Sequence, residues 1–334
     1  MNYIPSDWKK WIAENLLLQA DPKDLVRILV QNNFSSEIAD MEVQAAAAHP
    51  YVEAGRSLGR KLKKRDWVLD TYRILDAQSP NAATVERTGR LSREEFFEMY
   101  YSKNRPVIMK GALDHWKALT LWTPNYLKEH YGQHTVEIQA NRQSDPQYEL
   151  NTDRHKTLMG FAEYIDTITT AGVTNDYYMT ANNANRNTQI LQGLWSDIDL
   201  LPDYLAPQPN NSGFFWFGPA GTVTPVQHDL TNNFMAQVHG RKMVRLIPSC
   251  DLPNMHNDFH CYTDVDTGAP DLNRFPGYAK VRVIDCEIGP GDLLFLPVGW
   301  WHYVQGLDIS ITVSFTNFAC DNDFHSIYTT YREV

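Results

Sequence analysis

The sequence predicts a mainly β protein, a double-stranded β-helix or jelly roll with helical decoration, preceded by an α-helical N-terminal segment. Short segments rich in β-branched and aromatic residues dominate after residue 170, and Gly-Pro turns separate them. Helix-type periodicity is concentrated before that point. The chain has 334 residues, 43% hydrophobic and 12% aromatic, which is enough for one large core and a smaller one.

The predicted N-terminal segment covers residues 1–80 and contains four helices. Ser6 is expected to cap the first helix, and Asp21-Pro22 has the cap-then-proline pattern that begins a second. A third helix is expected from Ser35-Ser36 to just before Pro50, and a fourth, broken or bent, over about 52–76. Because these residues contain no constellation of ligands or nucleophiles, we expect a docking or dimerisation segment, with a homodimer as one outcome.

The larger domain is predicted over residues 83–334. Ser92 and Glu95 form a capping box before an apolar pair, a short strand is expected over 105–109, and a helix over 122–131. The strands expected after residue 170 are Asp176–Thr180, Gly213–Phe217, Phe234–Val238, Lys242–Ile247, Val281–Ile284, Asp292–Leu296 and Ile309–Phe315.

Charge is distributed unevenly along the chain. Residues 1–80 hold 11 basic and 11 acidic residues, whereas residues 81–334 hold 19 and 29, which accounts for the whole net charge of −10. This excess disfavours a nucleic-acid partner and favours a cationic one. The basic run at 60–65 is interpreted as a solvated helix face, with nucleic-acid or acidic-peptide binding as the less favoured alternative.

The compartment is expected to be the cytoplasm. The four cysteines show no CxxC spacing, which suggests reduced thiols. The first residues lack the basic and apolar regions of a signal peptide, and no apolar run approaches the ~18 residues needed to span a membrane.

Most candidate site residues fall in two short stretches of the sequence, 216–242 and 289–302. An Asp on one strand and a His on a distant strand can meet inside a small barrel, and a ligand two residues before the Asp would lie on the same face. If that ligand were His, two imidazoles and one carboxylate would hold Fe(II) and leave open positions for a cosubstrate and dioxygen.

Residues 83–318 resemble the JmjC or cupin-like family of Fe(II)- and 2-oxoglutarate-dependent oxygenases, and within it the branch of asparaginyl and arginyl hydroxylases. The resemblance rests on the motifs Trp216-Phe217-Gly218-Pro219, Asn233-Phe234, Gly240-Arg241-Lys242, Gly289-Pro290-Gly291-Asp292 and Trp300-Trp301-His302. It implies Fe(II), 2-oxoglutarate as cosubstrate, and hydroxylation of an amino-acid side chain in a peptide or protein.

The resemblance also implies roles for individual residues. Asp229 and His302 match the carboxylate and the distal histidine that bind the metal. Lys242 matches the lysine that pairs with the far carboxylate of 2-oxoglutarate, as a buried carboxylate requires. The other matches are the cosubstrate-binding positions Thr224 and Asn233, the weaker candidates Tyr178 and Asn317 for the same task, and Trp216 as an aromatic wall of the substrate cleft.

One position departs from the family pattern. The first metal ligand is expected two residues before Asp229, where this chain has Gln227 in place of His. His228 stands between them, and its side chain should point away from the metal unless a β-bulge re-aims it. Gln227 offers a neutral amide oxygen, a weaker donor for Fe(II) than imidazole. The sequence therefore leaves two hypotheses: a hydroxylase, or a degenerate oxygenase fold that binds a peptide or small carboxylate without turnover.

Overall fold

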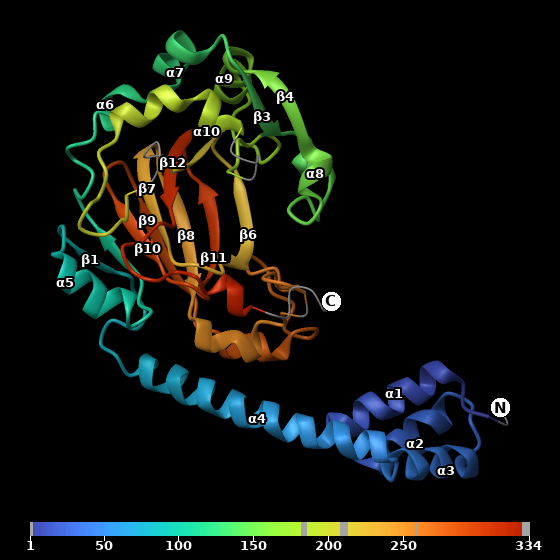
Figure 1. The fold of residues 1–334 in the computed structure, drawn as a ribbon. Coiled ribbons are helices and arrows are strands. Elements are labelled where there is room, and N and C mark those ends of the chain that lie inside the picture. The colour runs from blue at the N-terminus through green and yellow to red at the C-terminus, as the bar shows by residue number, and fades with distance from the viewer. Residues whose placement is uncertain (1–2, 182–185, 208–212, 258, 329–334) are drawn as a thin grey trace. The chain divides into compact units, whose positions relative to one another are not determined.

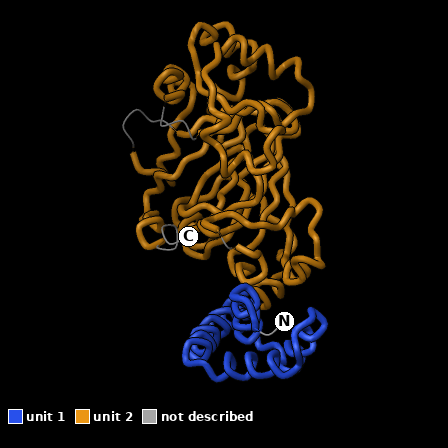
Figure 2. Tube along the Cα trace, turned by 90° about the vertical axis from the view of Figure 1, so that its right-hand side faces the viewer, with its two compact units in different colours: residues 1–72 blue, residues 73–334 orange. Residues whose placement is uncertain are grey.

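The computed structural model of the chain describes residues 3–181, 186–207, 213–257 and 259–328. The chain divides into two compact units, residues 1–72 and 73–334 (Figure 2). This division lies within one long helix, ahead of the boundary predicted near residues 80–83. No helix in the described ranges has the length and apolar character needed to cross a membrane.

The first unit is built from helices. They are α1 (Ser6–Leu17), α2 (Pro22–Gln31), α3 (Ser36–Ala47) and most of α4 (Pro50–Ala77). The predicted start of α2 is confirmed, since the Asp21 carboxylate accepts the Lys23 N–H at 2.9 Å. The predicted Ser6 cap is wrong: Ser6 is the first helical residue, and Pro5 precedes it without a side-chain hydrogen bond. The fourth helix is continuous rather than broken.

The second unit contains two facing sheets (Figure 1). The larger has the strand order β1 (Glu86–Thr88), β2 (Val107–Met109), β10 (Leu293–Leu296), β7 (Asn233–His239), β12 (Ser310–Phe315) and β5 (Phe214–Gly218). The smaller has the order β6 (Val223–His228), β11 (Trp301–Gly306), β8 (Lys242–Ile247) and β9 (Ile284–Ile288). Apart from the parallel pair of β1 and β2, the strands within these two sheets pair antiparallel. The predicted jelly roll is confirmed.

Side chains on β10 show how the two sheets enclose a core. Leu293 and Phe295 point to the face that packs against helices, and Leu294 and Leu296 point toward the smaller sheet. A strand buried on both faces explains why this segment is continuously apolar.

Helices and a small hairpin surround the two sheets (Figure 1). The helices are α5 (Arg93–Phe96), with a π-helical turn at Phe97–Tyr101, α6 (Ala118–Leu121), α7 (Pro124–Tyr131), α8 (Thr152–His155), α9 (Phe161–Thr170) and α10 (Arg186–Ile190). The hairpin pairs β3 (Thr135–Gln139) with β4 (Lys156–Gly160). Short 3-10 turns occupy Arg142–Ser144, Gln192–Asp197, Ser249–Asn254, Pro276–Lys280 and His325–Ile327. The predicted capping box of Ser92 and Glu95 is confirmed at the start of α5.

Two of the expected strands differ from the structure. The segment 176–180 makes only isolated bridges, which join Tyr178 to Gln139 and Met179 to Phe217. The strand expected over 281–284 begins at its last residue and continues to Ile288, because its partner β8 extends over that range.

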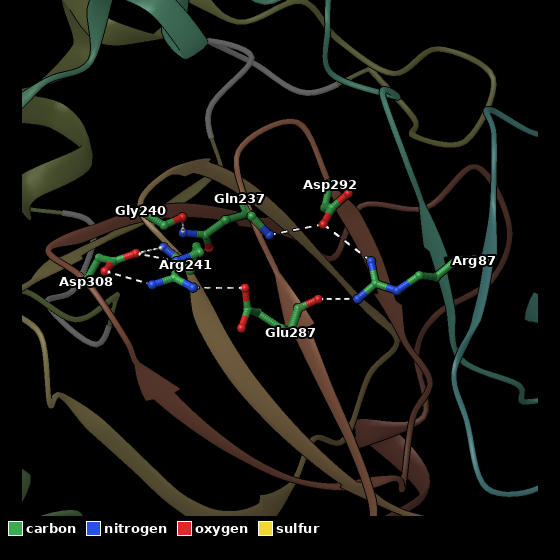
Figure 3. Close-up of polar contacts among 8 residues, drawn as sticks. Arg87, Gln237, Gly240, Arg241, Glu287, Asp292 and Asp308 are labelled. Carbon is green, nitrogen blue, oxygen red and sulfur yellow. Dashed lines mark hydrogen bonds and ion pairs between the residues drawn. The ribbon is translucent and has the colours of Figure 1, made fainter.

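An exposed ion network holds the start of β8 (Figure 3). The Arg241 guanidinium lies 2.8 Å from the Asp308 carboxylate and 3.3 Å from the Glu287 carboxylate. Arg87 of β1 donates to the backbone carbonyl of Glu287. Because neighbouring residues of a strand point to opposite faces, the network holds Arg241 at the surface while Lys242 points inward.

Candidate active site

Gln227 and His302 lie opposite each other on neighbouring strands of the smaller sheet. In the antiparallel pair of β6 and β11, Gln227 is level with His302, and His228 is level with Trp301. Since side chains alternate along a strand, the first pair shares one face and the second pair shares the other. Gln227 and His302 line a cavity of about 80 Å³ between the two sheets.

A β-bulge in β6 decides which side chains reach this cavity. Thr224 pairs with Val304 and Gln227 with His302, so three steps along β6 match two along β11. The extra residue falls at Pro225-Val226, on an edge strand, where a proline is tolerated. Without the bulge, Thr224 and Gln227 would face opposite ways; with it, both line the cavity. This bulge was not predicted from the sequence, where Pro225 is its one signal.

His228 points away from the cavity. Its ring packs edge-on against Trp301 with 4.8 Å between centroids, and its Nδ1 lies 3.3 Å from the backbone oxygen of Asp229. Burial lowers the pKa of His228, which favours a neutral ring. The bulge lies before Gln227, so it does not turn His228 toward the metal position.

Asp229 and His302 approach each other at one end of the cavity. Asp229 Oδ1 lies 4.0 Å from His302 Nε2. The other ring nitrogen, Nδ1, is 3.2 Å from the backbone oxygen of Trp300. A proton on Nδ1 that is donated to this carbonyl leaves the lone pair of Nε2 facing Asp229, which is the arrangement that a metal-binding histidine needs.

Gln227 supplies a third donor at the same end. Its Oε1 is buried and has no hydrogen-bond partner among the described residues. A buried oxygen without a partner is costly, so this atom is suited to a cation or a donor from a ligand. In the part of the chain that the structure describes, no three His, Cys, Asp or Glu residues are grouped to hold a metal. The donor set is therefore one imidazole nitrogen, one carboxylate and one amide oxygen, which fits a divalent metal with a weaker hold on Fe(II) than two imidazoles would give.

Asn233 contacts the metal end from the larger sheet. Its Nδ2 donates to Asp229 Oδ2 at 3.3 Å. Its own Oδ1 is buried and makes no hydrogen bond to the described residues. Asn233 thus orients the carboxylate and leaves one acceptor for a ligand.

Lys242 forms the opposite, cationic end of the cavity. Its side chain is 2% exposed, and its Nζ donates to the Tyr178 hydroxyl at 3.2 Å. None of the described carboxylates forms an ion pair with Lys242, and burial lowers its pKa to about 7. Burial also raises the pKa of Tyr178, which keeps its hydroxyl neutral. A buried ammonium without a counterion is a site for an anion.

The structure brings together six further lining residues around these two ends. Trp216 lines the cavity as expected, with its indole N–H donating to the Ser314 hydroxyl at 2.8 Å. The lining residues that the sequence did not indicate are Met235, Leu296, Val304, Thr312 and Ser314. Asn317 does not line the cavity: its amide donates to the backbone oxygen of Ala206 at 2.6 Å.

A second, larger cavity of about 830 Å³ lies on the other face of β6. Val223, Pro225 and Val226 contribute to its wall. Its lining has four aromatic rings and three carboxylates but, in the described ranges, no Lys, Arg or His; these rings and carboxylates belong to Tyr148, Phe259, Tyr262, Tyr303, Glu149, Asp264 and Asp266.

The sequence of this domain is similar to those of known proteins. Residues 93–318 match the family model of the cupin-like domain. This chain belongs to the cupin-like family. The cupin-like chain is 31% identical over 233 residues to lysine-specific demethylase 8 of Xenopus tropicalis, a match that covers 67% of this chain and 50% of that protein. The chain thus spans about half the length of that relative.

Two further relatives are named for different activities. The bifunctional peptidase and (3S)-lysyl hydroxylase JMJD7 of Homo sapiens is 24% identical over 66% of this chain and 79% of its own length. The tRNA wybutosine-synthesizing protein 5 of Gallus gallus is 24% identical over 72% of this chain and 79% of its own length. The predicted resemblance to JmjC or cupin-like oxygenases is confirmed, whereas the asparaginyl and arginyl branch stays a prediction.

Proposed function

We propose that this chain is an Fe(II)- and 2-oxoglutarate-dependent hydroxylase that acts on an amino-acid side chain in a peptide or protein. The observation that carries the proposal is the pairing of two complementary ends in one cavity. Lys242 is a buried cation without a carboxylate partner among the described residues. Gln227, Asp229 and His302 converge at the other end with one nitrogen and two oxygen donors.

The cavity residues would hold 2-oxoglutarate in a fixed orientation. Lys242 would pair with the carboxylate far from the metal, which supplies the counterion that the described residues lack. Tyr178, Thr224 and Asn233 would hydrogen-bond the same molecule, because each lines the cavity with a polar group. Trp216, which lines the cavity, would form an aromatic wall of the substrate cleft.

The metal end would be held by His302, Asp229 and, more weakly, Gln227. A bound Fe(II) supplies the activation of dioxygen that is coupled to decarboxylation of 2-oxoglutarate and oxidation of a C–H bond. The chain's own contribution is to orient the donors: the backbone of Trp300 fixes the tautomer of His302, and Asn233 fixes Asp229. The apolar side chains of Met235 and Leu296 line the cavity and would limit the access of water.

A degenerate binding module is the second candidate, and Gln227 is the observation that favours it. A neutral oxygen in place of an imidazole lowers the affinity for Fe(II), whereas the Lys242 end keeps the groups that hold a dicarboxylate. Such a protein would bind 2-oxoglutarate or a similar acid without consuming it.

Release of succinate from 2-oxoglutarate under saturating Fe(II), ascorbate and oxygen separates the two functions. The hydroxylase predicts turnover even without substrate, at a slow uncoupled rate, that disappears in Asp229→Ala. Arg241→Ala is the matched control, since this residue lies next to Lys242 but points to the surface. Tight 2-oxoglutarate binding with no succinate at any iron concentration would identify a binding module instead.

A peptide or protein with basic residues is the substrate class that we propose. Residues 81–334 carry 29 acidic and 19 basic residues, which disfavours RNA despite the tRNA-modifying relative. In the cavity behind β6, the rings of Tyr262 and Tyr303 and the Asp266 carboxylate are suited to Lys or Arg side chains. Glu149 and Asp264 already pair with Arg142 at 3.6 Å and with Arg274 at 4.0 Å. A cytoplasmic location belongs to the same proposal.

A further inference from the structure

Arg142 is a buried cation that lies next to both β6 and the ring of Tyr178. Its side chain is 0% exposed, and its Nη2 donates to the backbone oxygen of Val223 at 2.8 Å. Its Nε and Nη1 are also buried and make no hydrogen bond to the described residues. Because burying a charged group is costly, an arginine kept in this position indicates a role beyond filling space.

Two tyrosine rings contact the guanidinium. Its central carbon lies 4.3 Å from the ring centroid of Tyr148 and 5.1 Å from that of Tyr178. The Glu149 carboxylate lies 3.6 Å from Nη2 and supplies a countercharge. A guanidinium is planar and weakly hydrated, so it stacks on aromatic rings in a way that other side chains do not reproduce.

Tyr178 connects this stack to the cationic end of the central cavity. Its hydroxyl accepts a hydrogen bond from Lys242 Nζ at 3.2 Å, and its backbone bonds to that of Gln139. The ring also packs closely on Gly218, where an added Cβ would lie 2.7 Å from Tyr178 Cδ2. The backbone bonds leave the two side-chain torsions of Tyr178 free to change, so the place of its hydroxyl depends on the packing of Gly218 and Arg142 against the ring.

We propose that Arg142 is a positioning residue for the recognition of 2-oxoglutarate, which holds the Tyr178 hydroxyl beside Lys242. Arg142 is not among the residues that line the cavity, so it acts through Tyr178 and not by touching the ligand. Its bond to Val223 ties the same ring to the strand that carries Thr224. The inference rests on the proposed function and adds to it a residue from outside the cavity.

Calorimetric titration of 2-oxoglutarate into Arg142→Met tests this role. Methionine keeps an unbranched side chain but loses the planar charge, so we expect the Kd to rise about tenfold. Arg245→Met is the matched control, because Arg245 is a partly buried arginine of β8 that pairs with Asp285 at 2.8 Å and points away from the cavity. This control should lower the Tm and leave the Kd unchanged.

A double-mutant cycle separates positioning from a general loss of stability. Tyr178→Phe should itself weaken binding, because it removes the hydroxyl that Arg142 positions. In that background, Arg142→Met should raise the Kd by less than about twofold further. An arginine with only a structural role would weaken binding by the same factor in both backgrounds. Arg142→Lys, which keeps the charge, gives the same comparison if Arg142→Met fails to fold.

Three outcomes would overturn the inference and leave the proposed function standing. They are a wild-type Kd in the folded Arg142 variants, a wild-type Kd in Tyr178→Phe, and a loss of affinity that is equally large with and without the Tyr178 hydroxyl. A wild-type protein that binds no 2-oxoglutarate would instead overturn the proposed function, and this inference with it. The Kd can be measured whether or not the protein turns 2-oxoglutarate over.

Discussion

The two ends of the central cavity differ in how fully they provide what the family's reaction requires. At one end, Lys242 is buried beside Tyr178 and presents an amine that pairs with none of the described carboxylates. At the other, His302 and Asp229 are oriented by their neighbours, but the third donor is the amide of Gln227. Under the proposed function, affinity for the cosubstrate and affinity for the metal would therefore depend mainly on different residues.

Removing the cation should have the largest effect. Lys242→Ala should weaken 2-oxoglutarate binding by about 3–5 kcal/mol, because it leaves a buried carboxylate without a partner. This corresponds to roughly a hundredfold to several thousandfold in Kd. Isothermal titration calorimetry measures it. Lys242→Met separates this loss from misfolding, since removing an unpaired buried charge should keep or raise the Tm of the ligand-free protein. Equal affinity in variant and wild type would exclude Lys242 from the site.

Restoring an imidazole at position 227 should strengthen metal binding at the other end of the cavity. Gln227→His should raise Fe(II) affinity by about tenfold or more and increase succinate formation, because a nitrogen donor replaces a neutral oxygen. The wild type should contain little iron, as elemental analysis of the purified protein would show. His228→Ala is the matched control and should leave metal affinity almost unchanged, since its ring packs against Trp301. Stoichiometric iron in the wild type that is lost in His228→Ala would contradict this assignment.

The pH dependence of 2-oxoglutarate binding should come from the titration of Lys242. Burial lowers the pKa of Lys242 to about 7 in the free protein, and a bound carboxylate raises it again by stabilising the ammonium. Binding above pH 7 therefore takes up a proton, and the Kd should rise by up to about tenfold per pH unit there and stay level just below it. Calorimetry in buffers of different ionisation enthalpy counts the protons. A Kd that is independent of pH from 6.5 to 9 would contradict a pKa near 7.

Breaking the surface network should have the smallest effect. Arg241→Ala removes exposed contacts to Asp308 and Glu287, and exposed ion pairs contribute about 0–1 kcal/mol each. We expect a Tm lower by a few degrees at most and an unchanged Kd for 2-oxoglutarate. A large loss of binding would show that the network positions Lys242 rather than only stabilising the edge of the sheet.

The sequence alone was sufficient to predict helix caps and to recognise the motifs that contain the site residues. The caps at Asp21 and Ser92 and the continuously apolar strand β10 depend on neighbouring residues and were predicted correctly, whereas β6 and β11 were not among the expected strands. The motifs around Asp229, Lys242 and His302 were sufficient for the family resemblance, and the structure places these three residues along one cavity.

Tertiary structure decided what each side chain can reach. The bulge at Pro225-Val226 places both Thr224 and Gln227 in the cavity, and its location depends on the register with β11, which is distant in sequence. The amide of Asn317 donates a hydrogen bond to the backbone oxygen of Ala206, a contact that no local sequence pattern reveals. Lys242 lacks a carboxylate partner among the described residues because the residues that the two sheets bring next to it, such as Tyr178, carry no negative charge. Periodicity fixes the face of a residue within its own strand, whereas the partners on that face depend on contacts between distant segments.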